Sequence, residues 1–245
     1  MRTIYILAFT AFVAAAPAAH ATIMTNAIDN ATVQPAGPRT GTNGKRFLNI
    51  ESSPNAGFAS YGVIDFQFGS VAAQPAFTTL TIALTQANAS FTSNGRLNFY
   101  LTTATSASLQ PGLSPLVFGG NTEGTANNVA SGQLALLSLG SGTFTQVNNG
   151  TENDYSFALS ATLASVLASD VRTNSVTRLV VTPADAAVAA TYAGSTSTTP
   201  ERLTLAGAAA TAVPEPATLL LLGVSAGALA LRRRGRPMLQ TYNKA

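Results

Sequence analysis

The sequence predicts a mainly β domain: an antiparallel two-sheet sandwich of jelly-roll type with one short helix. Apolar and polar residues alternate in several short stretches, which is the pattern of half-buried strands. Clusters of Gly, Pro, Asn and Ser separate about nine such stretches, as turns do between sandwich strands. Only 9% of the residues are charged. The outer faces must therefore be mostly neutral and polar, as exposed antiparallel sheets are.

The first 21 residues have the three parts of a secretory signal peptide. Arg2 supplies a positive charge, residues 4–16 are apolar, and Ala19 and Ala21 form an A-x-A cleavage site. We expect export through the Sec translocon and cleavage after Ala21.

The remaining chain is long enough for one domain, expected at residues 22–210. Residues 22–46 are rich in Asn, Thr, Gly and Pro and predict a short edge strand or two with loops. From Phe47 onward the pattern is β. Further strands are expected at residues 61–68, 80–84, 97–101, 134–139, 144–147, 155–159, 176–182, 188–192 and 202–205.

Two stretches depart from the strand pattern. Residues 102–131 form a long polar segment, and a loop of that length indicates either function or flexibility. Leu159, Leu163, Val166 and Leu167 recur at helical spacing, so residues 160–169 predict a short amphipathic helix.

Two tyrosines are candidate carbohydrate contacts. Tyr61 and Tyr100 oppose the apolar face of their strands, and an exposed ring can stack on the apolar face of a sugar. The alternative is that both rings are partly buried cross-strand partners.

Oxygen-bearing side chains gather near one predicted hairpin. Glu152 and Asp154, with Asn149 and Asn153, offer the carboxylate and amide oxygens that calcium prefers. The alternative is a solvated loop without a metal, which is the interpretation we adopt.

Residue inventory argues against an enzyme. Asp65 and Glu51 are the carboxylates to consider as a glycosidase pair, but a lone carboxylate on the polar side of a strand is normally just exposed. The chain has no Cys, and its single His, His20, lies in the signal peptide. We therefore expect no catalytic residues, no metal and no cofactor.

The net charge of +3 comes from the processed ends. Six of the 13 Lys and Arg residues and one of the ten acidic residues lie there. The mature part keeps seven basic and nine acidic residues, a net charge of −2. Nucleic-acid binding loses its electrostatic basis.

A linker at residues 211–216 precedes an apolar stretch. Pro214 and Pro216 favour extended backbone around them. Residues 217–231 carry no charge and would form roughly 22 Å of helix, which is shorter than the roughly 30 Å core of a bilayer. A helix that began at Val213 would nearly span that core. The tail at 232–245 begins with a basic stop-transfer cluster that stays cytoplasmic, made of Arg232, Arg233, Arg234 and Arg236.

This order resembles the PEP-CTERM sorting signal of Gram-negative bacteria. The matching motif residues are Val213, Pro214, Glu215 and Pro216, followed by the apolar helix and the arginines. The resemblance implies an inner-membrane intermediate, recognition and cleavage by an exosortase, and delivery to the envelope, outer surface or extracellular matrix. It also implies a structural or adhesive role in biofilm and a possible exopolysaccharide partner.

The domain itself is similar in order to DNRLRE-type domains, which are jelly-roll sandwiches like carbohydrate-binding modules. Residues 30–33, 61–66, 80–84 and 200–205 carry this similarity, although the motif that names the family is absent. The alternative function that it implies is a module that binds matrix polysaccharide.

Overall fold

The computed structural model describes residues 20–39, 42–52, 58–69, 76–110, 116, 119, 129 and 134–209. Residues His20–Ala208 form one compact unit. The predicted signal peptide up to Ala19, the linker, the apolar helix and the basic tail lie outside the described residues. No helix within the described ranges is long and apolar enough to cross a membrane.

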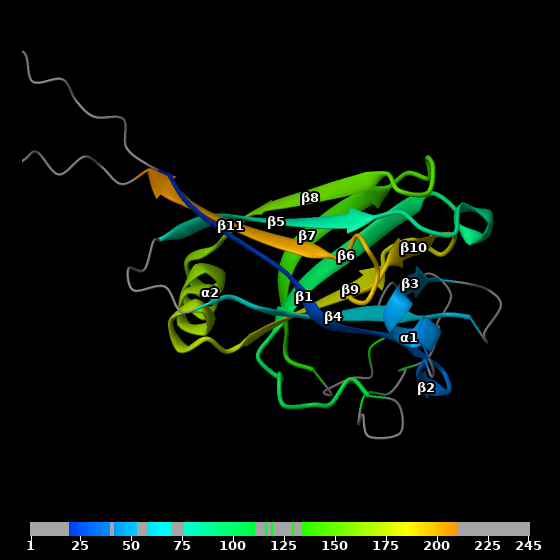
Figure 1. Cartoon of the computed structure of the whole chain (residues 1–245), viewed down its shortest axis with the longest axis horizontal. Coiled ribbons are helices and arrows are strands. Elements are labelled where there is room, and N and C mark those ends of the chain that lie inside the picture. The colour runs from blue at the N-terminus through cyan, green and yellow to red at the C-terminus, as the bar shows by residue number, and fades with distance from the viewer. Residues whose placement is uncertain are drawn as a thin grey trace, which may run out of the picture. The chain divides into compact units, whose positions relative to one another are not determined.

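The domain is built on one nine-stranded antiparallel sheet in the order β7-β6-β9-β4-β1-β11-β5-β8, with β2 paired to β1 (Figure 1). A second sheet pairs β10 with β3. The strands are β1 (His20–Gln34), β2 (Gly37–Pro38), β3 (Phe47–Glu51), β4 (Tyr61–Gln67), β5 (Phe77–Thr85), β6 (Gly95–Thr102), β7 (Leu136–Phe144), β8 (Glu152–Ala158), β9 (Val176–Pro183), β10 (Ala189–Ala193) and β11 (Arg202–Ala209). The helices are α1 (Thr42–Arg46), the 3-10 turn η1 (Ala89–Phe91) and α2 (Ala161–Thr173).

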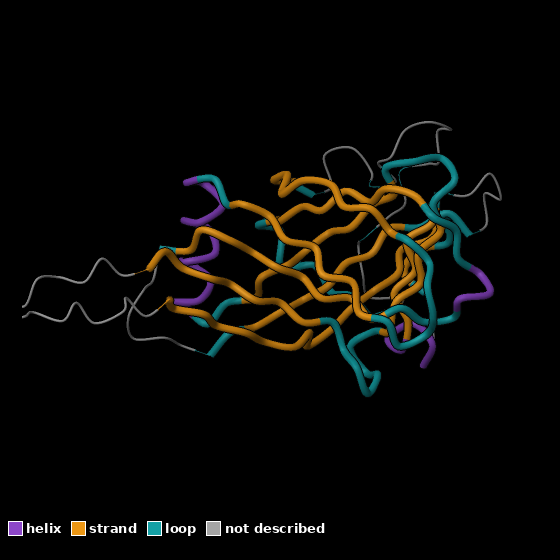
Figure 2. The backbone as a smooth tube through the Cα atoms, turned by 90° about the horizontal axis from the view of Figure 1, so that it is seen from above, coloured by secondary structure: helices purple, strands orange, loops and turns teal. Residues whose placement is uncertain are grey.

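The large sheet curls until its two end strands, β7 and β8, approach each other. The sheet is nearly closed, between a sandwich and a barrel, and the strands wrap around a common interior (Figure 2). Gly142 of β7 lies against the ring of Tyr155 on β8, where a side chain on Gly142 would collide with it. The predicted antiparallel β fold is confirmed.

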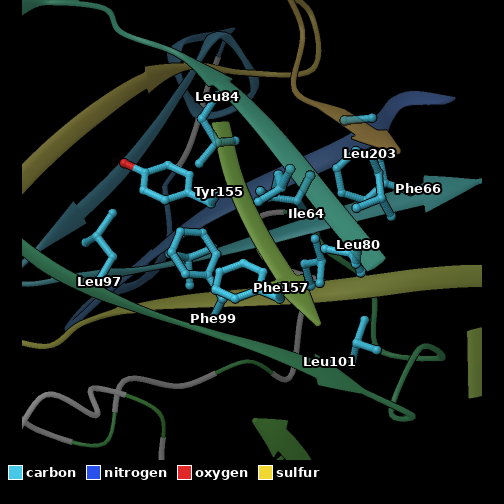
Figure 3. Packing of buried hydrophobic residues seen from close by; sticks show 14 of the residues in the cluster. Ile64, Phe66, Leu80, Leu84, Leu97, Phe99, Leu101, Tyr155, Phe157 and Leu203 are labelled. Atoms are coloured by element: carbon cyan, nitrogen blue, oxygen red, sulfur yellow. The ribbon is translucent and has the colours of Figure 1, made fainter. Parts of the chain in front are cut away.

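The main core lies inside this curled sheet. Phe99 of β6 meets Tyr155 and Phe157 of β8, with ring centroids 4.7 and 5.1 Å apart (Figure 3). Leu97, Phe99 and Leu101 of β6 are all buried there, as their alternation predicts. Each such side chain contributes about 1.5–3 kcal/mol by leaving water.

A second buried cluster lies on the outer face of β4 and β9. Tyr61, Val63 and Val180 point there and contact Leu109, Leu116 and Val129 of the long segment after β6. Six consecutive residues of β4, 61–66, are buried because both faces of the strand are covered. The described parts of the long polar segment thus form a cover on the sheet.

Several predicted elements need correction. Residues 20–34 form the 15-residue strand β1, which lies inside the sheet between β4 and β11 and is not an edge strand. Of the strand expected at residues 144–147, only Phe144 is strand, as the last residue of β7, and residues 145–147 are loop because the chain turns there. The predicted helix exists but runs to Thr173, because Ser160 caps its start and left-handed Asn174 ends it.

Candidate functional site

Neither tyrosine singled out from the sequence forms an exposed stacking surface. Tyr61 has no exposed surface because the segment after β6 covers it, and this burial raises its pKa above the ordinary range. Tyr100 is half-buried and packs against the same cluster. The expectation of an outward-facing ring is wrong for Tyr61, because the outer face of β4 is covered. Tyr100 on β6 is partly buried, as the alternative interpretation predicts.

Asp65 is also buried, with 7% of its surface exposed. Both its carboxylate oxygens accept hydrogen bonds from Arg178. Burial raises the pKa of Asp65, and the adjoining guanidinium opposes that rise. The expectation of an exposed carboxylate is therefore wrong. The bidentate bond to Arg178 gives Asp65 a structural role.

Three of the four candidate calcium ligands have separate partners, and the fourth, Asp154, is exposed. Glu152 forms an ion pair with Arg202 at 2.7 Å, and the amide oxygen of Asn153 accepts from Gln86 at 2.7 Å. The amide oxygen of Asn149 accepts from the backbone of Ala89. In the described part of the chain, no group of three or more His, Cys, Asp and Glu residues could hold a metal.

The structure instead brings together two loops that sequence reasoning missed. Residues 86–94 join β5 to β6 and residues 145–151 join β7 to β8, and we call the pair the loop platform. Gln86 at its base is 3% exposed. Its amide nitrogen donates to the carbonyl of Thr145 and to Asn153, at 2.8 and 2.7 Å, and its amide oxygen accepts from Val147 N at 2.9 Å. One buried amide therefore joins both loops to β8.

Further hydrogen bonds tie the loops together nearer the surface. Gln146 donates from its side chain to the carbonyl of Ala89 at 2.7 Å, and its backbone donates to Asn94 Oδ1 at 2.8 Å. Ala89 N donates to Asn149 Oδ1 at 2.9 Å. Backbone bonds to β10 from Ala87 and Ser93 hold the first loop from the other side. The loop platform is thus held in one arrangement before any partner arrives.

The exposed surface of the loop platform is uncharged. Phe91 is 71% exposed and Val147 is 52% exposed. Neither loop contains Asp, Glu, Lys or Arg. The side chains of Asn88 and Asn148 are exposed and make no hydrogen bond with the described residues. One sequence feature could have indicated this site. Phe91 is a single aromatic residue among small polar residues next to a predicted turn, and it belongs to no stretch of strand alternation.

The loop platform lies at one end of the domain. β5 begins at Phe77, which pairs with Gly207, and reaches the platform after Thr85. β11 runs antiparallel to it, so its C-terminal end lies at the Phe77 end of β5. Figure 1 places the β5–β6 and β7–β8 connections at the end away from α2. The chain leaves the domain at the end opposite the platform.

A family model for the PEP-CTERM protein-sorting motif matches residues 212–234, which follow β11 in the chain. The match includes the predicted motif at residues 213–216 and Arg232 to Arg234, and Arg236 follows it. No curated protein matches the chain. The likeness of the domain to DNRLRE-type domains stays a prediction. The chain therefore carries the PEP-CTERM signal of an exported protein that an exosortase sorts toward the cell surface.

Proposed function

We propose that the β domain is a non-catalytic structural or adhesive component of the cell envelope or extracellular matrix. The observation that carries the proposal is the direction of β11. This strand ends on the side of the domain away from the loop platform and leads into the sorting motif. The rigid, uncharged loops and the C-terminal end of β11 therefore lie at opposite ends of the domain.

The absence of a catalytic role is supported by how the buried acids are used. Asp65 forms an ion pair with Arg178, and Glu201, the residue directly before β11, is fully buried. Substrate could not reach either carboxyl without opening the domain. The partly buried carboxylate of Asp29 pairs with Lys45, and the exposed carboxylate of Glu152 pairs with Arg202.

A carbohydrate-binding module of the matrix is the second candidate. It is favoured by the exposed ring of Phe91, which stands on loops rich in amide groups. Exopolysaccharide would then be the partner that retains the protein after sorting.

The adhesive role is tested in the producing bacterium. One strain makes the whole protein, and a second lacks residues 22–209 but keeps both terminal signals. We expect weaker surface attachment and a matrix that is more easily washed away in the second strain. A third strain carries Pro214→Ala with Pro216→Ala and should keep the precursor in the membrane. Equal attachment in the first two strains would refute the adhesive role, whatever the third strain shows.

A further inference from the structure

We infer that the loop platform is a binding site for a neutral polysaccharide, with Phe91 as its stacking residue. The inference rests on the proposed adhesive function and assigns it to one place on the domain. It moves the carbohydrate contact from the outer face of β4, where Tyr61 is covered, to the end of the sandwich.

The first argument is the rigidity of the platform. Five side-chain hydrogen bonds, all 2.7–2.9 Å long, connect residues 86–94 with residues 145–151. Gln86 makes two of them from a buried position. A pre-arranged surface binds with a smaller loss of conformational entropy than loops that must be ordered. Loops that only connect strands would not need this many side-chain hydrogen bonds.

The second argument is the exposed ring. Phe91 follows directly after Ser90 in the 3-10 turn η1, and 71% of its surface is in contact with water. The C–H groups of a sugar ring present an apolar face that packs on an aromatic ring, and packing removes both apolar surfaces from water. Phe91 is more exposed than Tyr61 and Tyr100, the rings predicted from sequence.

The third argument concerns the ligand's charge. Asn88 and Asn148 present amides whose donors and acceptors are suited to hydroxyl groups. The platform has no Lys or Arg to neutralise an acidic polymer. Phosphate or carboxylate ligands are usually bound by such cations. Neutral hydroxyl-bearing chains therefore fit this surface better than nucleic acid or acidic glycans.

The test uses the exported, processed protein on immobilised dextran, mannan and galactan, with alginate as the acidic comparison. We expect binding to at least one neutral polymer and little binding to alginate. Phe91→Ala should weaken it about tenfold or more, which corresponds to about 1.4 kcal/mol. Asn148→Asp, which adds a charge at nearly constant size, should also weaken it. Met24→Ala is the matched control, since Met24 is 63% exposed on β1, outside the platform, and should bind as the wild type does.

Three results would overturn the inference. These are binding to no neutral polymer, equal binding by the Phe91→Ala and wild-type proteins, and self-association in sedimentation that Phe91→Ala abolishes. The last would assign the platform to a second copy of the chain. Urea unfolding of every variant separates these outcomes from misfolding. If the wild-type protein binds no neutral polymer while its producing strain attaches normally, this site alone is refuted and the adhesive function stands.

Discussion

Arg178 of β9 donates from Nε and Nη2 to the two carboxylate oxygens of Asp65 on β4, at 2.6 and 2.8 Å. The two residues are direct cross-strand partners. The same guanidinium donates to the carbonyls of Ala104 and Ala107, at 3.0 and 2.8 Å. One buried cation therefore joins two strands and fastens the start of the long segment over the outer face of the sheet.

Arg178→Met should destabilise the domain by about 3–5 kcal/mol, because it leaves a buried carboxylate without its counter-charge. Two loop carbonyls also lose their donor. The free energy of unfolding in urea measures the effect. Arg202→Met is the matched control: the Arg202–Glu152 pair is exposed, and such pairs contribute at most about 1 kcal/mol. Similar small losses in both variants would contradict a structural role for the buried pair.

Glu201 makes the stability depend on pH. Its carboxyl group is fully buried, and neither oxygen has a hydrogen-bond partner among the described residues. Burial, with a smaller contribution from Asp29, raises its pKa from 4.5 to about 8. As pH rises, the Glu201 carboxyl loses its proton at lower pH in the unfolded chain than in the folded domain. The free energy of unfolding therefore falls as pH rises from about 4.5 toward 8.

The urea midpoint should accordingly be lower at pH 8 than at pH 5.5. Glu201→Gln should flatten this dependence and raise the midpoint at pH 8, because a neutral amide replaces the group that ionises. Glu152→Gln, at an exposed position, should leave the dependence as it is. An unchanged slope in Glu201→Gln would show that another group is responsible.

Tyr155 and Tyr192 share a buried hydrogen bond between their hydroxyl groups at 2.7 Å. Burial raises the pKa of Tyr155 to about 12, so both hydroxyls stay protonated at neutral pH. Replacing either tyrosine by Phe leaves one buried hydroxyl unsatisfied, at a cost of about 1–3 kcal/mol. The double Phe variant should lose less than the two single losses combined, and urea unfolding of all four proteins measures this coupling. Additive losses would contradict it.

Processing at the sorting motif predicts what mass spectrometry will recover. The exported protein should yield peptides from the β domain and none from residues 238–244, which follow the motif. Membranes of the strain with Pro214→Ala and Pro216→Ala should yield both sets. Peptides from residues 238–244 in the exported protein would show that the motif is not cleaved.

Local sequence patterns were sufficient to predict the features of this protein that depend on residues close together in the chain. Alternation placed Leu97, Phe99 and Leu101 in the core, and a spacing of three to four residues located the helix after Ser160. The sorting motif was recognisable for the same reason, because prolines, an apolar stretch and arginines follow one another directly. Period and composition act over a few residues, so the sequence by itself determined these features.

Only the tertiary structure decided which faces are covered and which residues meet. Asp65 and Arg178 are 113 positions apart, and the loops of the platform are joined by bonds that span 52 to 61 positions. Tyr61 is buried because a segment that reads as polar loop packs over it, and β1 lies inside the sheet because β11 returns to pair with it. Alternation records that a strand has two different faces. It does not record what later parts of the chain will cover them, since that depends on long-range pairing and register.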